Sequence, residues 1–203
     1  MQLNDNIYRI DGTNGNVYVI IAGENIIQVD SGMKGQFGKI RDFYDKMKVR
    51  PSIVIITHSH MDHIGALAEV HDRFSPRIYA HKKEIPVIRG ERGMYAKSAT
   101  IRLVGMVLKA KPVKEVADIA EINMEGIETV ETPGHTPGSI TVVYTRDNEK
   151  YAFVGDAAFE ENGGLHINER FSLDVETAKK SLEKIIAMKP VTVLPGHGNP
   201  IKL

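Results

Sequence analysis

The sequence predicts a single α/β domain in which sheets with helices outside them form a layered sandwich. Three observations support this prediction. The chain has 203 residues, of which 42% are hydrophobic, and this length allows one substantial core. Strand patterns alternate with helical patterns along much of the chain. No repeat, low-complexity tract or obvious linker divides it, so residues 1–203 are predicted to form one domain.

The first part of the chain contains predicted strands and then an alternation of helix and strand. Turn residues around Gly12 and Gly23 separate the first strands, and we expect strands linked in this way to pair antiparallel. The four aliphatic residues at 53–56 are typical of a fully buried strand. The predicted elements are strands at residues 6–10, 16–21 and 25–30, a helix at 35–48, a strand at 53–56, a short helix from about residue 64 and a strand at 77–80.

Residues 82–114 differ from the rest of the chain. They contain nine Lys or Arg residues and only two Glu residues. Apolar residues recur at helical spacing between Gly93 and Pro112, so we expect a basic helical insertion or lid. Such a lid could accept an apolar chain and an anionic group, or its apolar side could form a dimer contact or pack on the core. The candidate substrate contacts are Met94, Tyr95, Lys97, Arg102 and Met106.

After this segment the strand and helix patterns resume. A proline at residue 190 ends the predicted helix before it, because proline cannot continue a helix. The predicted elements are strands at residues 127–131, 140–144 and 151–154, a helix at about 174–188 and a last strand at 191–194.

The composition excludes several classes of protein and site. The chain has no cysteine, which rules out disulfides, thiolate metal ligands and a cysteine nucleophile. Its formal net charge is zero, which argues against general binding to nucleic acids or other polyanions. No apolar run approaches the roughly 20 residues that span a bilayer, and the polar N-terminus lacks the features of a signal peptide. We therefore expect a cytoplasmic protein that has no membrane-spanning segment.

The strongest functional signal is the sequence HSHMDH at residues 58–63, directly after a predicted buried strand. In extended backbone His58 and His60 point the same way, and a turn after them can direct Asp62 and His63 to a second, neighbouring point. A lone histidine is more often a surface or core residue than a ligand. Three imidazoles and a carboxylate this close together would be costly to bury unless a cation were bound. One short loop can therefore serve two metal ions.

Three later segments repeat this design, in which a strand is followed by a tight loop with one ligand-type residue. Prolines and glycines surround His135, Asp156 ends an apolar strand, and His197 follows a glycine turn. Each segment is weak evidence alone. Together with the first loop they supply five His and two Asp residues. This set is enough to surround two metal ions bridged by one carboxylate, with positions left for water.

With these motifs the sequence resembles the metallo-β-lactamase-fold hydrolase superfamily, and within it the short glyoxalase-II-like members. The resemblance spans nearly the whole chain, from VDSG at residues 29–32 to PGHG at 195–198. It implies a four-layer αββα sandwich. The metal ligands that it implies are His58, His60 and His135 for the first metal, Asp62, His63 and His197 for the second, and Asp156 between the two.

The resemblance also implies that Asp30 orients a ligand loop without touching a metal, a role that such sites usually need. The alternative interpretation is a carboxylate that simply ends a strand at a turn. The other histidines, His71, His81 and His166, fall outside the motifs. We interpret His71 as a helix-surface or packing residue and the other two as loop residues.

The function implied by the resemblance is that of a hydrolase with two zinc ions, with iron or manganese as further candidate metals. The metals lower the pKa of a bridging water from about 15.7 toward 7, so that hydroxide is the nucleophile. One metal would polarise the substrate oxygen, and Asp62 could orient the hydroxide or handle its proton. We expect a small thioester, ester or lactone as substrate. Because the chain ends shortly after His197, we do not expect the glutathione-binding helical region of glyoxalase II.

Three other functions stay open. A persulfide dioxygenase would hold one iron with His58, His135 and Asp156, a ligand set that suits oxygen chemistry. A phosphodiesterase or nuclease would use two metals and could contact phosphates through the basic segment, although a solvated charged face is the commoner role of such segments. A non-enzymatic protein would keep metal only for stability, and the complete motif set argues against it.

Overall fold

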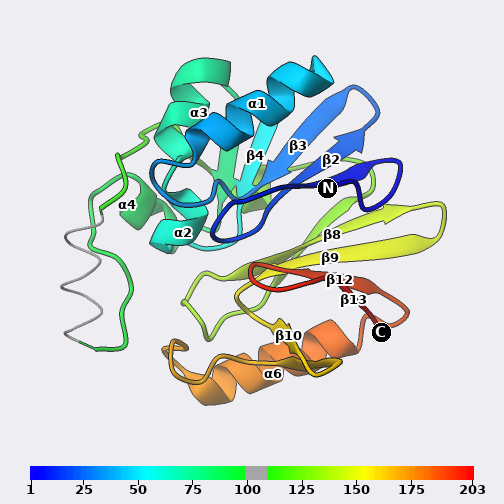
Figure 1. Ribbon diagram of the computed structural model, residues 1–203. Coiled ribbons are helices and arrows are strands. Elements are labelled where there is room, and N and C mark those ends of the chain that lie inside the picture. The colour runs from blue at the N-terminus through cyan, green and yellow to red at the C-terminus, as the bar shows by residue number, and fades with distance from the viewer. Residues whose placement is uncertain (99–108) are drawn as a thin grey trace.

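The computed structural model describes residues 1–98 and 109–203, and in this part of the chain two sheets pack face to face between helices. Helices α1 and α3 cover the outer face of one sheet, and α6 covers the outer face of the other (Figure 1). This arrangement confirms the predicted αββα sandwich. The helices are α1 (Phe37–Met47), α2 (Met61–Ile64), α3 (Leu67–Phe74), α4 (Ile85–Ile88), the 3-10 helix η1 (Ile119–Glu121) and α6 (Val175–Ile186).

The first sheet has its strands in chain order. Its strands are β1 (Ile7–Ile10), β2 (Val17–Ala22), β3 (Asn25–Val29), β4 (Ile53–Ile56), β5 (Arg77–Ala80) and β6 (Ala117–Asp118). The first three pair antiparallel, as expected for strands joined by tight turns. From β3 to β6 the pairing is parallel, and α1 and α3 supply crossovers between these strands. The carboxyl ends of β3, β4 and β5 therefore meet at one edge of the sheet.

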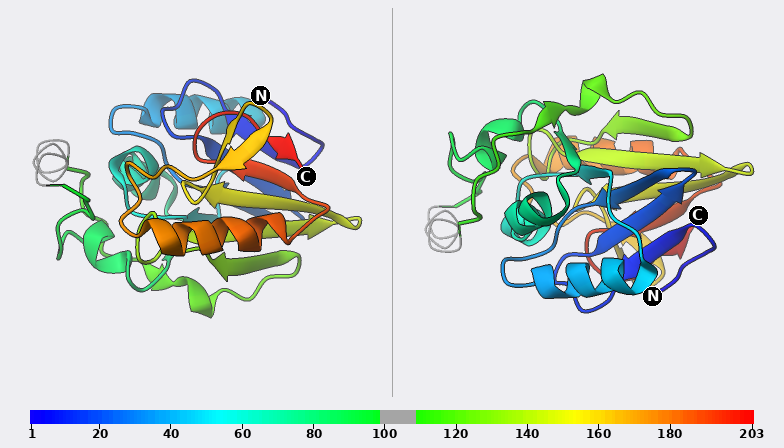
Figure 2. Two further views of the ribbon diagram at one scale, coloured as in Figure 1. Left: turned by 90° about the horizontal axis from the view of Figure 1, so that it is seen from below. Right: turned by 90° about the horizontal axis from the view of Figure 1, so that it is seen from above.

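The second sheet has the strand order β13-β12-β9-β8-β7. Its strands are β7 (Ile127–Glu131), β8 (Ile140–Arg146), β9 (Glu149–Gly155), β12 (Thr192–Pro195) and β13 (Ile201–Lys202). Strands β7, β9 and β12 run in the same direction, because β8 is antiparallel to both β7 and β9 while β12 is parallel to β9. Figure 2 shows the two sheets from outside, with α6 lying along one of them and α1 along the other.

Successive side chains of a strand point to opposite faces of its sheet, and the core is therefore divided into three apolar layers. On β4, Val54 and Ile56 face the helices, whereas Ile53 and Ile55 face the second sheet. The strand is therefore buried on both faces, as the continuous aliphatic run predicts. A third layer lies between the second sheet and α6, and it includes the fully buried Ile185.

The structure differs from the sequence prediction mainly in its short elements. In place of one helix from about residue 64, α2 ends at Ile64 and α3 begins at Leu67, and the Gly65 amide donates to Gly32 O at 2.8 Å. The strands β10 (Phe159–Glu161) and β11 (Gly164–His166) form an unpredicted hairpin. The prediction that His166 lies in a loop is therefore wrong. Elements of two or three residues are too short to show a hydrophobic period.

The described part of residues 82–114 contains one short helix, α4. The remaining described residues of this segment form neither helix nor strand. Most of the apolar residues that predict a longer helix lie in residues 99–108, outside the described part, and so do Arg102 and Met106. The helical lid therefore stays a prediction. In the described residues, no helix has the length and apolar character needed to cross a bilayer.

Substitution of Ile55 by Ala tests the layer between the two sheets, where this side chain is fully buried. We expect Ile55→Ala to lower the free energy of unfolding by about 2–5 kcal/mol, because the loss of buried apolar atoms and the new cavity both destabilise the folded state. The matched control is Ile186→Ala on α6, where the side chain is 37% exposed and the change should stay within about 0.5 kcal/mol. Urea denaturation measures both values. Equal effects would contradict this packing.

Candidate metal centre

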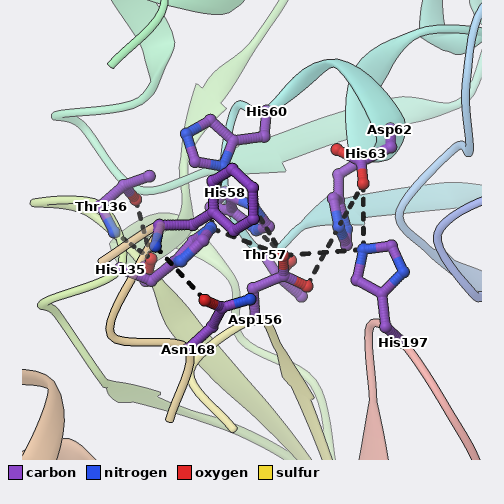
Figure 3. A network of polar contacts seen from close by, with 12 residues as sticks. Thr57, His58, His60, Asp62, His63, His135, Thr136, Asp156, Asn168 and His197 are labelled. Carbon is purple, nitrogen blue, oxygen red and sulfur yellow. Dashed lines mark hydrogen bonds and ion pairs between the residues drawn. The ribbon is translucent and has the colours of Figure 1, made fainter. Parts of the chain in front are cut away.

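The predicted ligands come together at the edge where strands of both sheets end (Figure 3). His58 and His60 follow β4, and α2 carries Asp62 and His63. From the second sheet, His135 follows β7, Asp156 follows β9 and His197 follows β12. The structure therefore brings all seven predicted ligands into one cluster, although they come from four separate segments of the chain.

The carboxylate of Asp156 lies at the centre of the cluster. Its Oδ1 atom is 3.2 Å from His63 Nε2. Its Oδ2 atom is 3.9 Å from His58 Nε2, 3.5 Å from His135 Nε2 and 3.7 Å from His197 Nε2. One carboxylate thus faces histidines from both predicted ligand groups, which is the geometry that a bridging ligand requires.

The ligand atoms form three groups in the described residues, and within each group they lie within 4.8 Å of one another. Two of the groups match the predicted ligand sets, and the third joins them. The groups are His58, His60 and His135; Asp62, His63 and His197; and His58, His63 and Asp156. Each of them could hold a metal ion. The set expected for a single iron, His58, His135 and Asp156, also lies together, because the two Nε2 atoms are 3.9 and 3.5 Å from Asp156 Oδ2.

Three histidines are hydrogen-bonded through the ring nitrogen that points away from the cluster. The contacts are His58 Nδ1 with Thr57 Oγ1 at 3.2 Å, His60 Nε2 with Tyr95 O at 3.1 Å and His63 Nδ1 with Asp30 Oδ2 at 2.8 Å. A carbonyl and a carboxylate only accept, so His60 and His63 donate through these nitrogens. In the neutral form of each ring, the opposite nitrogen then carries the lone pair that a metal needs.

Asp30 lies behind the cluster, where we predict that it orients ligands. Its carboxylate accepts hydrogen bonds from the Thr57 amide and the Thr57 hydroxyl, both at 2.8 Å, in addition to its contact with His63. The residue is buried and its φ of 61° is in the left-handed region, which a non-glycine residue adopts only at a cost. This unfavourable backbone conformation lies directly after β3, and from there the Asp30 side chain reaches both Thr57 and His63.

The histidines of the first group are easily deprotonated. Burial, reinforced by neighbouring histidines, holds the pKa of His58 well below its usual value, and burial also lowers the pKa of His60. Burial lowers the pKa of His135 to about 4. These three imidazoles are therefore neutral at pH 7, which is the form that binds metal.

The second group is charged. Burial alone would lower the pKa of His63, but the carboxylates of Asp156, Asp30 and Asp62 outweigh it and raise the pKa well above the usual value. The hydrogen bond to Asp62 at 2.9 Å raises the pKa of His197. Burial opposes ionisation of Asp62, but His63 and His197 outweigh it and lower its pKa to about 2. This group thus holds protons that a metal would displace.

Four polar atoms of the cluster residues are buried and make no hydrogen bond within the described residues. They are His58 Nε2, His63 Nε2, His135 Nδ1 and Asp156 Oδ1. A buried polar atom without a partner costs about 1–3 kcal/mol, and a bound cation would offset this cost for His58 Nε2, His63 Nε2 and Asp156 Oδ1, which lie close together. Imidazole and carboxylate ligands suit zinc, iron and manganese. The residues of the cluster therefore fit metal ions.

Sequence reasoning missed the residues that hold the His197 loop. The Asn16 side chain donates to Pro195 O at 2.9 Å and to Gly198 O at 3.0 Å, and the Tyr18 hydroxyl donates to Pro195 O at 2.8 Å. No motif marks these residues, because they are far from His197 in the sequence. The other unpredicted supporting groups are Thr57, Glu84 and the carbonyl of Tyr95.

Of the predicted substrate contacts, the structure describes Met94, Tyr95 and Lys97, and each of them has different surroundings. Tyr95 is buried, its hydroxyl donates to Lys83 O at 2.8 Å, and its carbonyl faces His60, so the structure gives it a supporting position instead. Lys97 donates to Glu169 O at 2.6 Å. Met94 lines a cavity of about 370 Å³ whose described lining residues include none of the histidines. Arg102 lies outside the described residues.

The remaining histidines take no part in the cluster, as expected. His71 lies on α3, 3.9 Å from Glu115. His81 is buried and its Nε2 atom lies 3.4 Å from Glu131 Oε1. His166 ends β11.

The chain matches known proteins over nearly its whole length. The family model described as "Metallo-beta-lactamase superfamily" matches residues 10–197. The probable metallo-hydrolase YqgX of Bacillus subtilis (strain 168) is 30% identical over 188 residues, covering 90% of this chain and 84% of that protein. The structure of BLEG-1, a B3 metallo-beta-lactamase, is 25% identical with a TM-score of 0.76, covering 97% and 93% of the two chains. TTHA1623 in a di-iron-bound form is 22% identical with a TM-score of 0.74, covering 96% and 93%, and shows the same fold.

The opposite pKa shifts predict different proton release from the two ligand groups. A metal bound by Asp62, His63 and His197 must displace the proton held by His63, so we expect release of about one proton or more at pH 7. Affinity there should fall as pH falls below the raised pKa. Metal bound by the first group should release few protons, because those imidazoles are already neutral. Calorimetry in buffers of different ionisation enthalpy counts the protons, and equal release in both binding steps would contradict this assignment.

Proposed function

This chain belongs to the metallo-beta-lactamase superfamily, and from this membership and the geometry of the cluster we propose that it is a dinuclear metal-dependent hydrolase. The observation that carries the proposal is the position of Asp156, whose carboxylate faces His58 and His135 as well as His63 and His197. A single metal would not need a carboxylate shared between two ligand groups. The description of YqgX as a probable metallo-hydrolase supports the same class of reaction.

In the proposed enzyme the two ligand groups each hold one ion, and zinc is the proposed metal. Bound zinc supplies Lewis acidity, which polarises a substrate carbonyl and lowers the pKa of water into the neutral range. The metal ligands would be His58, His60 and His135 at the first site, Asp62, His63 and His197 at the second, and Asp156 at both.

Asp62 has a second task in this proposal. Its Oδ2 atom pairs with His197 Nε2 at 2.9 Å, and the side chain is 25% exposed, so solvent reaches it. With a pKa of about 2 the carboxylate is ionised at neutral pH. An ionised carboxylate accepts a hydrogen bond from water. Asp62 would therefore orient the attacking water.

Side-chain nucleophiles near the cluster are already engaged, which favours water as the attacking group. The Ser59 hydroxyl donates to Glu84, and the Thr57 hydroxyl donates to Asp30 at 2.8 Å. The sequence has no cysteine. A bound metal would supply an activated water, so that no covalent enzyme intermediate is needed. The proposed substrate is a small thioester, ester or lactone.

The contacts of the basic segment favour an acyl substrate over a phosphodiester. Lys111 pairs with Asp72 at 2.8 Å, Lys97 donates to Glu169 O, and Arg89 donates to Val116 O at 2.8 Å. Basic side chains that are engaged within the protein do not form a ready surface for a phosphate backbone. This observation supports the interpretation of the segment as a solvated, self-contained face.

Metal content is the first test of the proposed function. The protein is purified without affinity tag or chelator from medium that contains both zinc and iron, and elemental analysis measures the metals. We expect about two zinc ions per chain, because two ligand groups share one bridging carboxylate. About one iron per chain would contradict the proposal and favour an oxygenase, for which oxygen uptake with a persulfide is the next assay.

Ligand substitutions connect the metals with turnover. We expect His60→Ala and Asp156→Ala to lower kcat/KM for a small thioester or lactone by more than about 100-fold, the upper range for loss of an outer-shell partner alone. His71→Ala is the matched control, because His71 lies on α3 outside the cluster, and it should keep wild-type activity. Circular dichroism checks that each variant is folded. Full activity in either ligand variant would refute the assignment.

A further inference from the structure

Glu84 is a fully buried carboxylate that belongs to none of the ligand groups. It lies directly before α4, after β5. Its Oε2 atom accepts hydrogen bonds from the Ser59 amide at 3.0 Å and from the Ser59 hydroxyl. Its Oε1 atom accepts from the Thr136 hydroxyl and from the Gly138 amide, both at 2.8 Å. Four donors thus offset the cost of burying the carboxylate.

These four donors come from the two loops that carry the first ligand group. Ser59 lies between His58 and His60, and Thr136 directly follows His135. One donor from each loop is a backbone amide, so Glu84 contacts the main chain of both loops. The distance between the loops at this point is therefore set by the width of a single carboxylate group.

The packing around Glu84 leaves it little freedom to move. A Cβ atom at position 138 would lie 2.7 Å from Glu84 Oε1 and 2.8 Å from His81 Nδ1, so only glycine lets the backbone come this close. The Thr136 hydroxyl also contacts Ser139 Oγ at 2.7 Å, which fixes its direction. Glu84 is thus held in one position while it binds both loops.

A separate backbone contact joins the same two segments where they leave the sheets. The Ile140 amide donates to Thr57 O at 3.0 Å. This contact would survive the loss of Glu84 and keep the two sheets together. Glu84 instead acts at the loops themselves, between the residues that present His60 and His135, whose ring nitrogens lie 2.8 Å apart.

The second ligand group has its own supports. Asp30 holds His63, and Asn16 and Tyr18 hold the loop that carries His197. The hydrogen bonds of Glu84 reach none of these residues. Its direct hydrogen bonds are therefore confined to one side of the cluster.

We propose that Glu84 is a positioning residue that sets the separation of the loops carrying His58, His60 and His135, and thereby the affinity of this ligand group for its metal ion. The inference rests on the proposed dinuclear site. It differs from a purely structural role, because loss of Glu84 should weaken one metal site and spare the other.

Glu84→Gln tests the proposal with little change in shape. The amide replaces one acceptor oxygen by a donating NH2 group, which must face the amide of either Ser59 or Gly138. A backbone amide cannot accept, so one loop is pushed away. Zn2+ titration of the wild-type protein against a competing chelator should show two sites. In the Glu84→Gln protein, the Zn2+ affinity of one of these sites should fall by about 10–100-fold.

Combining Glu84→Gln with a substitution in one or the other ligand group identifies the affected site. With His197→Ala the first group remains intact, and adding Glu84→Gln should weaken the remaining Zn2+ site by about 10–100-fold. With His135→Ala the second group remains intact, and adding Glu84→Gln should leave its affinity unchanged. The matched control is Glu131→Gln, an exposed carboxylate whose side chain faces His81 and which should change neither affinity.

The outcomes separate this inference from the proposed function. A wild-type protein that binds fewer than two Zn2+ ions overturns the dinuclear site and the inference with it. Two wild-type sites that Glu84→Gln weakens equally, or does not weaken, overturn the inference alone. If Glu84→Gln does not fold, Thr136→Val removes one donor at nearly constant volume, and it should weaken only the first site, by less than Glu84→Gln would. Unchanged affinity in the Thr136→Val protein would also overturn the inference.

Discussion

The buried carboxylate of Asp30 joins the segments that form the candidate metal centre. It binds the backbone and hydroxyl of Thr57 at the end of β4, and it also binds the ring of His63 on α2. The segment between Thr57 and His63 is therefore held at both ends by one group. His58 and His60 lie within that segment, so their directions follow from the same contact. The cost is a left-handed backbone at Asp30, which the surrounding core compensates.

A second constraint is that ligands from two different sheets must meet at one point. Hydrogen bonds between the two sheets make this possible: Glu84 contacts loops from both sheets, and Asn16, directly before β2 of the first sheet, holds the His197 loop of the second. The close approach also restricts the residues that fit. A Cβ atom at position 196 would overlap Asp156 Oδ1, so glycine is required beside the central carboxylate.

The two ligand groups are electrostatically different although they share a carboxylate. The first consists of three imidazoles that burial keeps neutral, whereas the second pairs a carboxylate with imidazoles that hold protons. The carboxylate of Asp156 lies between the two groups. Burial opposes its ionisation, but the nearby histidines, His63 first, outweigh burial and hold its pKa well below the usual value. The same cluster thus holds one group of imidazoles in the form that binds metal and another group in which a metal would compete with protons.

Much of this architecture follows from local sequence patterns, because burial and turn chemistry act over short distances. The aliphatic run of β4 predicts a strand buried on both faces, and the HSHMDH motif predicts a loop that presents ligands in two directions. The sequence analysis missed the hairpin β10–β11, since three residues per strand carry no clear period, although Asn162-Gly163 at its turn is a pair typical of tight hairpins. The sequence by itself therefore determined the layers and the histidines and aspartates that gather in the cluster. Only the tertiary structure decided which side chains support the ligands, because Glu84, Asn16 and Tyr18 act through contacts with residues far away in the chain, and their own sequence surroundings carry no sign of those contacts.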